Sequence, residues 1–182
     1  GSGGWFTIEQ IEAAIKPRGL PVYPPTTLIE IENTHNRSGG IVFPQAEVVR
    51  ICALARARGI ATFLDGARLW NAAVASGRRE AELAEPFDLV AVSFSKGLGA
   101  PGGSLLAGRR DLVAAAARQR RMLGGAMRQT GFFAAAALHG IEHHRARLAE
   151  DHANARRFAQ ALATHPSVEL DLATVQTNIV VF

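Results

Sequence analysis

The sequence predicts an α/β fold with a mainly parallel sheet. Short apolar segments that are typical of buried strands alternate with longer segments of helical periodicity along the 182 residues. Three polar residues, Asn36, Asp65 and Lys96, each follow one of the apolar segments. Ligands of parallel α/β sheets bind at the carboxyl ends of the strands. We therefore expect these three side chains to share one site.

Capping residues and apolar spacing define the expected elements of the first half. Thr7 can cap a helix whose isoleucines recur every three or four residues. Pro44 suits the first turn of a helix, and Gly59 and Gly77 suit positions where helices end. The expected elements are a helix over residues 7–16, a strand over 27–32, a helix over 44–58, a strand over 60–64 and a helix over 69–76.

The second half is expected to continue the sheet and then to become helical. Lys96 comes just after a strand, and a long helical segment is broken near Gly140. We expect residues 1–130 to form part of a large domain, and residues 131–182 to form a long helix and the start of a small C-terminal domain. The expected elements are strands over 88–94 and 103–107, a helix over 111–122, a helical segment over 128–164, and strands over 168–170 and 178–182.

Composition and charge argue against several classes of protein. The net charge is +4, but the arginines are scattered along the helices beside acidic residues, so we expect no nucleic-acid partner. No apolar run is long enough to cross a membrane, and the first residues lack the features of a signal peptide. The single cysteine, Cys52, cannot form an internal disulfide. We expect a buried thiol and a cytoplasmic protein.

Lysine is scarce in this chain. Of the 20 lysines and arginines, only Lys16 and Lys96 are lysines. Positive surface charge is therefore supplied almost entirely by arginine, and a lysine in an apolar, glycine-rich segment suggests a task that arginine cannot perform. Imine formation is such a task, because it needs a primary amine with a reachable neutral form.

The segment Ser93–Pro101 surrounds Lys96 with small residues. Gly97 and Gly99 are expected to let a flat cofactor lie against the backbone, while hydroxyls such as that of Ser95 can donate hydrogen bonds. A tight turn with an exposed lysine is the structural alternative. The glycines also match a dinucleotide-binding pattern, but Pro101 and a strand follow where that pattern needs a helix. A nicotinamide or flavin site is therefore disfavoured.

The segment Asp65-Gly66-Ala67-Arg68 has polar groups at a strand end. A carboxylate at Asp65 can hydrogen-bond a protonated pyridine nitrogen and so make the ring an electron sink. Arg68 can contact an anionic oxygen of a cofactor or a substrate carboxylate. The structural alternative is a helix-capping aspartate beside a surface arginine. The two motifs lie about 30 residues apart, each at a strand end.

Taken in order along essentially the whole chain, these motifs and three others resemble the low-specificity threonine aldolases. That family belongs to the β-eliminating lyase group of fold-type-I pyridoxal 5'-phosphate (PLP) enzymes. The matching segments are Glu32-Asn33-Thr34-His35-Asn36, Asp65-Gly66-Ala67-Arg68, Ser95-Lys96-Gly97-Leu98-Gly99-Ala100-Pro101, Met127-Arg128-Gln129 and Asp151-His152-x-Asn154-Ala155.

The resemblance implies the large PLP-binding domain of fold type I and a retro-aldol cleavage. A β-hydroxy-α-amino acid such as threonine would give glycine and an aldehyde, in glycine biosynthesis or threonine catabolism. It also implies a cytoplasmic homo-oligomer, a dimer or tetramer. The implied catalytic residues are Lys96, Asp65 and His35; the cofactor contacts are Lys96, Asp65, Arg68, Asn36 and Ser95; the substrate contacts are Arg68, Arg121 and Arg128.

The chain departs from the family pattern in three ways. Ala126 replaces the third glycine before Met-Arg-Gln, and Val22 or Tyr23 stands where many members have a histidine. The family's phosphate-binding loop and ring-stacking histidine would precede this sequence, and a carboxylate-binding arginine would follow Phe182. We therefore expect these residues alone to be a poor catalyst. The alternatives are β-elimination, transamination, or an incomplete fragment with a structural role.

The segment His139-Gly140-Ile141-Glu142-His143 matches a zinc-binding pattern. The adjacent His144 and the surrounding arginines fit an exposed helix equally well, and the aldolase resemblance accounts for the region without a metal. We expect no metal site.

Overall fold

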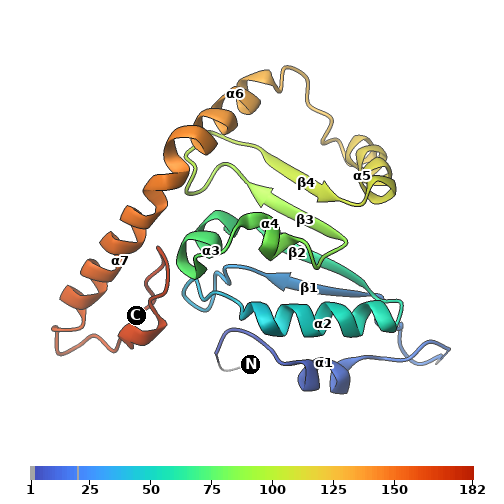
Figure 1. Ribbon diagram of the computed structural model, residues 1–182, viewed down its shortest axis with the longest axis horizontal. Helices are drawn as coiled ribbons and strands as arrows, with labels where there is room; N and C mark the ends of the chain where they lie inside the picture. Colours follow the sequence, from blue (N-terminus) through green and yellow to red (C-terminus); the bar gives the residue numbers. More distant parts are fainter. Residues whose placement is uncertain (1–2, 20) are drawn as a thin grey trace.

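A computed structural model describes residues 3–19 and 21–182 of the chain. Its centre is a four-stranded sheet in the order β1-β2-β3-β4 (Figure 1), so the expected α/β fold is confirmed. The first three strands are parallel and the last is antiparallel to its neighbour. The strands are β1 (Leu28–Glu32), β2 (Ala61–Gly66), β3 (Leu89–Ser93) and β4 (Ser104–Gly108).

The helices follow the expected order along the chain. The π-helical segment η1 (Gly140–His144) and the 3-10 turn η2 (Arg145–Arg147) join α6 to α7 where the sequence predicted a break. The five-residue α4 was not predicted, because a single turn shows no clear periodicity. The helices are α1 (Ile8–Ala14), α2 (Gln45–Ala57), α3 (Leu69–Ser76), α4 (Glu80–Ala84), α5 (Arg110–Met122), α6 (Gly131–His139) and α7 (Leu148–Leu162).

Local chemistry explains where α1 begins. The Thr7 hydroxyl accepts a hydrogen bond from the Gln10 amide, and the Gln10 side chain accepts one from the Thr7 amide. This reciprocal pair satisfies two backbone donors that the first turn would otherwise leave without partners. The buried Glu47 of α2 accepts a third, from the Ile8 amide, and so ties α1 to α2.

The core lies between one face of the sheet and helices α2, α3 and α4. It contains fully buried side chains from each layer, such as Ile31 of β1, Ile51 of α2 and Leu83 of α4. Cys52 is buried in the same cluster, as expected. Because successive strand residues point to opposite faces, β2 turns Leu64 into this core and presents Asp65, which is half-buried, on the other face.

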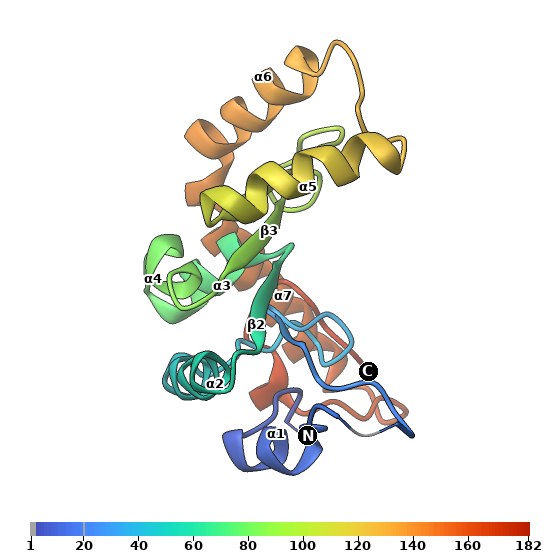
Figure 2. The same ribbon diagram turned by 90° about the vertical axis from the view of Figure 1, so that its right-hand side faces the viewer.

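Helices α6 and α7 form one long diagonal run beside the sheet. The arrowheads of β1 and β3 point toward this run in Figure 1, so the carboxyl ends of the parallel strands face it. Helix α6 and helix α1 lie at opposite ends of the molecule in both views (Figures 1 and 2). The lysine-containing turn after β3 therefore lies against the helical run, and its contacts are described below.

Two expectations for the C-terminal residues are wrong. The segments 168–170 and 178–182 are not strands; a short 3-10 turn, η3 (Leu172–Thr174), lies between them. Polar side chains near the second segment bond to the loop after β1 instead: the Thr177 hydroxyl donates to the Gly40 carbonyl at 2.8 Å, and the Gln176 side chain accepts from the Val42 amide at 3.0 Å. Neither segment has a neighbouring strand in the described residues, and a strand needs one.

None of the helices in the described ranges combines the length and the apolar character that crossing a membrane requires.

Candidate active site

Asp65 and Lys96 lie at the same edge of the sheet. Strands β2 and β3 are parallel neighbours, with Asp65 beside Ala91 in the register. Lys96 comes three residues after the end of β3. Both residues are therefore at the carboxyl edge, which is where the sequence predicted a shared site.

Asp65 is held by its own turn. Its backbone carbonyl accepts a hydrogen bond from the Asn33 amide at 2.9 Å, which joins the ends of β2 and β1. Its carboxylate Oδ1 accepts from the Ala67 amide at 3.0 Å. This second bond lies within the turn before α3 and does not cap the helix, whose N-cap is Arg68, and it engages one carboxylate oxygen. The other oxygen, Oδ2, has no hydrogen bond to the part of the chain that is described.

Arg68 begins the helix that follows Asp65. It occupies the N-cap position of α3, and its backbone carbonyl accepts a hydrogen bond from the Ala72 amide at 3.1 Å. The side chain is half-buried and makes no ion pair with the described residues. The guanidinium therefore stands three residues from Asp65 in the same turn, free to meet an anion.

Lys96 is the first residue of a tight turn. The Gly99 amide donates to the Lys96 carbonyl at 2.9 Å, and the Ala100 amide donates to the Phe94 carbonyl at 3.0 Å. The Lys96 side chain is exposed, and within residues 3–19 and 21–182 its amine has no hydrogen-bond or ion-pair partner. Ser95, also exposed, pairs its hydroxyl with that of Ser93 at 3.2 Å. The amine is thus available for chemistry.

The glycines of this turn face protein. A Cβ on Gly97 would lie 2.6 Å from Leu148 Cδ2, and one on Gly99 would lie 3.4 Å from His144 Nδ1. The small size of these glycines lets α7 and η1 approach the turn, and the expectation that they also let a flat cofactor lie against the backbone stays a prediction. Leu148 and His144 were missed because sequence spacing does not show which helix a glycine faces.

His35 and Asn36 occupy the loop after β1, at the same carboxyl edge. The His35 Nδ1 pairs with the Ser38 hydroxyl at 2.7 Å, and its Nε2 lies 3.6 Å from a Glu32 carboxylate oxygen. The Asn36 amide donates to the other Glu32 oxygen at 3.0 Å. The Asn36 side chain is exposed. Glu32, the last residue of β1, therefore contacts both His35 and Asn36 in this loop.

The structure does not bring the helix that carries Arg121 to this edge. Helix α5 follows β4, which runs antiparallel, and the Arg109 amide just before it bonds to the Asp88 carbonyl at the amino end of β3. Both views place α5 away from the carboxyl ends of β1 and β3 (Figures 1 and 2). Arg128 lies in the exposed connection between α5 and α6.

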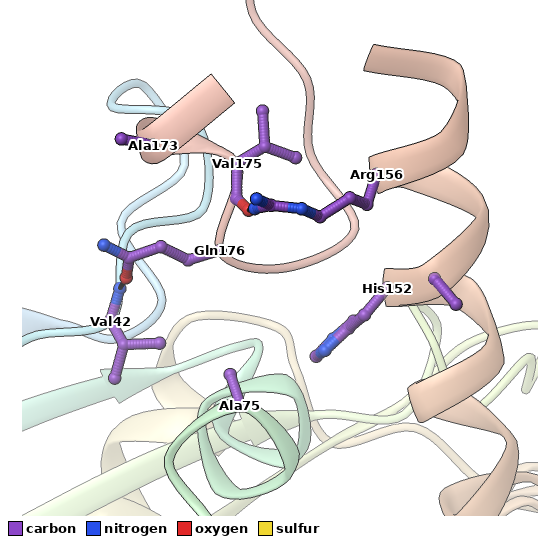
Figure 3. A pocket seen from close by; sticks show the side chains of 8 residues that line it. Val42, Ala75, His152, Arg156, Ala173, Val175 and Gln176 are labelled. Carbon is purple, nitrogen blue, oxygen red and sulfur yellow. Dashed lines mark hydrogen bonds between the residues drawn. The ribbon is translucent and has the colours of Figure 1, made fainter. Parts of the chain in front are cut away.

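A hollow of about 660 Å³ lies between α3, α7 and the C-terminal residues (Figure 3). His152 and Arg156, one turn apart on α7, both extend toward it. One nitrogen of each side chain already has partners: Asn71 Nδ2 pairs with His152 Nε2 at 3.0 Å, and Arg156 Nη1 donates to the Leu172 and Val175 carbonyls. Burial lowers the pKa of His152 below its ordinary value, against the smaller, opposite influence of Asp151. The hollow is a packing seam, distinct from the Asp65–Lys96 edge.

The histidine cluster near Gly140 makes no metal centre in the described residues. The rings of His139 and His143 lie 4.4 Å apart, and no group of three or more metal-binding side chains converges there or elsewhere in those residues. His144 instead bonds to the lysine turn.

The α/β fold that carries these groups is shared with solved structures. One, named as a candidate L-allo-threonine aldolase from Listeria monocytogenes EGD-E, has a TM-score of 0.83 and 27% identity, covering 97% of this chain and 47% of that one. Another, from Exiguobacterium sp. 255-15 and named for aromatic amino acid β-eliminating lyase or threonine aldolase, has a TM-score of 0.84 and 25% identity, covering 98% and 48%.

The family described as Beta-eliminating lyase matches residues 1–182, and the chain belongs to this family. Low-specificity L-threonine aldolase 1 of Arabidopsis thaliana is 39% identical over 178 residues, which are 97% of this chain and 50% of that protein. The low specificity L-threonine aldolase of Escherichia coli O157:H7 is 41% identical over 159 residues, covering 87% and 46%. The chain thus spans about half the length of the curated relatives it matches.

Proposed function

We propose that the protein is a PLP-dependent aldehyde-lyase that cleaves a threonine-like β-hydroxy-α-amino acid into glycine and an aldehyde. The observation that carries this proposal is the placement of Lys96 and Asp65 at the carboxyl ends of two adjacent parallel strands. The names of the relatives support the reaction. A cytoplasmic location and assembly as a dimer or tetramer stay predictions.

The residues at this edge fit the reactive end of the cofactor. An exposed primary amine, a carboxylate with one oxygen left for a donor, and a guanidinium form a suitable set of groups. The glycine turn after β3 offers no cradle for the phosphate, because Gly97 and Gly99 face Leu148 and His144. When bound, PLP supplies a conjugated ring that accepts the electron pair of the broken Cα–Cβ bond.

Each residue of the chain has a distinct task in this proposal. Lys96 would hold the cofactor covalently through its side-chain amine. Asp65 holds a proton on the ring nitrogen through a charge-assisted hydrogen bond. Arg68 binds either the phenolic oxygen of the cofactor or the substrate carboxylate, and its place in the turn after β2 supports both assignments.

His35 is the proposed acceptor of the substrate hydroxyl proton. The pairing of Nδ1 with the Ser38 hydroxyl holds the ring in place, and in a neutral imidazole the nitrogen without a proton can take one. The hydroxyl proton leaves the substrate as the Cα–Cβ bond breaks, and Cα is then protonated, which gives glycine and the aldehyde. Asn36 and Ser95 are proposed as cofactor contacts at the same edge. Arg121 and Arg128 are proposed as substrate contacts that they would make at the site of another subunit.

The test is to identify the lysine that carries PLP in the full-length protein. Borohydride reduction in the presence of PLP, followed by peptide mapping, should place the label on Lys96. Lys96→Ala should lose the label and the release of glycine from threonine. Lys16→Ala is the matched control, because Lys16 is the only other lysine in the sequence, and it should keep both. A label on Lys16, or bound PLP without a label on Lys96, would refute the proposal.

The same assay separates the rival reactions. Retro-aldol cleavage of threonine releases glycine and acetaldehyde, whereas β-elimination releases ammonia and a four-carbon 2-oxo acid. If the 2-oxo acid dominates while Lys96 carries the label, the cofactor assignment stands and the reaction assignment is wrong.

A further inference from the structure

The turn that carries Lys96 is fixed from outside by one histidine. Within the turn, the Leu98 side chain is fully buried, and its carbonyl accepts a hydrogen bond from His144 Nδ1 at 2.8 Å. His144 lies 46 residues away along the chain, at the end of the π segment η1. The bond therefore joins the lysine turn to the long helical run.

The direction of this bond sets the protonation of the ring. A carbonyl oxygen can only accept, so Nδ1 must be the nitrogen that carries the proton. The His144 ring is half-buried and packs edge-on against the His139 ring at 5.1 Å. Its orientation is thus restrained from two sides.

Small residues allow the close approach that the bond needs. A Cβ on Gly140 would lie 2.5 Å from the Leu98 carbonyl oxygen, so only glycine lets the helix come this near. The π segment begins at this buried Gly140 and ends at His144. Single-turn π segments inside helices are often found at functional sites, because the extra residue changes where a side chain points. Here the π segment ends at His144, the residue whose side chain reaches the lysine turn.

We propose that His144 is a positioning residue for Lys96, an inference that rests on the proposed role of Lys96 as the cofactor-bearing lysine. Leu98 is the third residue of the turn that Lys96 opens and Gly99 closes. Fixing the Leu98 carbonyl fixes the peptide that joins Leu98 to Gly99, and so holds the Gly99 amide on the Lys96 carbonyl. The Lys96 backbone is then fixed, and the side chain extends its amine from the turn in one direction. An amine held in the reacting geometry reacts faster than one that samples many orientations.

The experiment compares His144→Asn with His144→Leu in the full-length protein. The Asn amide nitrogen occupies the position of Nδ1 relative to the backbone and can donate to the Leu98 carbonyl. Leucine has the same shape as asparagine but no donor. Both variants lose the same part of the ring, so the difference between them reports the hydrogen bond alone. Melting temperature and near-UV circular dichroism confirm that each variant is folded.

Two measurements follow the turn and the amine. In cofactor-free protein, hydrogen exchange at the Gly99 and Ala100 amides should be about threefold to tenfold faster in the Leu variant, the range expected for one hydrogen bond. In the Asn variant it should stay close to that of the natural protein. The rate at which borohydride-reducible PLP accumulates on Lys96 should fall in the Leu variant and recover in the Asn variant.

If the Leu variant does not fold, His144→Ala with and without added imidazole replaces it. Imidazole should then restore slow exchange and fast labelling. Equal behaviour of the Asn and Leu variants would overturn the inference, as would faster exchange with unchanged labelling of Lys96. Absence of label on Lys96 in the natural protein would overturn the proposed function and this inference together, whereas a labelled natural protein with an unaffected Leu variant overturns the inference alone.

Discussion

Leu148 of α7 fills the space beside Gly97, where a side chain on residue 97 would have to stand. A methyl group there would lie 2.6 Å from Leu148 Cδ2. We expect Gly97→Ala to lower the free energy of unfolding by about 1–3 kcal/mol, because overpacking forces neighbouring atoms apart. Urea denaturation measures this change. Gly131→Ala is the matched control: no atom lies within 4 Å of its Cβ position, so its stability should stay within about 1 kcal/mol.

The partner variant Leu148→Ala tests whether the clash is with this leucine. Leu148 is almost fully buried, so its truncation alone should cost about 2–5 kcal/mol. In the double variant the new methyl group enters the space that Leu148 leaves, and the loss should be smaller than the sum of the two single losses by about 1 kcal/mol or more. Additive losses would show that Gly97→Ala acts through another contact.

We expect His152 to make the free energy of unfolding depend on pH. Burial lowers its pKa in the folded protein, and Asn71 Nδ2, which can only donate, pairs with the Nε2 of the neutral ring. As pH falls below the ordinary imidazole pKa of about 6.5, the unfolded chain takes up a proton that the folded chain resists. The free energy of unfolding should therefore fall with decreasing pH between about 6.5 and the lowered pKa.

The control for this prediction is His152→Gln. Its side-chain oxygen stands near the position of Nε2 and can accept from Asn71, but it does not titrate. The slope of stability against pH, measured by urea denaturation between pH 8 and pH 5, should become shallower in this variant. His143→Gln, at an exposed position, should leave the slope unchanged. An unchanged slope in His152→Gln would contradict the prediction.

Cys52 should be unreactive in the folded protein. Burial raises the pKa of its thiol to about 11. At pH 8 only about one thiol in a thousand is then ionised, and the thiolate is the reactive form. We expect modification by a disulfide reagent to be slow in the folded protein and fast in urea, followed by absorbance. Rapid modification without denaturant would mean that α2 opens readily.

Asp65→Asn separates cofactor attachment from catalysis. The Asn oxygen can still accept from the Ala67 amide, so the turn should keep its shape. The amide carries no charge and cannot hold the proton on the ring nitrogen. We expect Lys96 to be labelled as before while kcat for glycine release falls roughly 100-fold or more, the scale typical of losing one electrostatic stabiliser. A variant with unchanged kcat would remove Asp65 from the proposed mechanism.

The order of the elements and the edge that holds Asp65 and Lys96 could be predicted from the sequence. Both depend on local signals: apolar strands, capping residues such as Thr7, and polar residues where strands end. Interactions between distant segments could not be predicted, since spacing along the chain does not show that Gly97 meets Leu148 or that Leu98 meets His144. The segment 178–182, with its apolar run 179–182, looked like a strand because periodicity does not reveal whether a partner strand is present.

Because of the π segment between α6 and α7, the contacts of α7 depend more on the number of residues in Gly140–His144 than on which residues they are. Each residue of an α-helix turns the chain by about 100°, so a one-residue deletion within Gly140–His144 would rotate α7 by about that angle relative to α6. Leu148 would swing away from Gly97 and His152 away from Asn71, although α7 itself kept all of its residues. Among natural variants, substitutions on the outer surface of this helical run should therefore be common, whereas insertions and deletions within it should be rare.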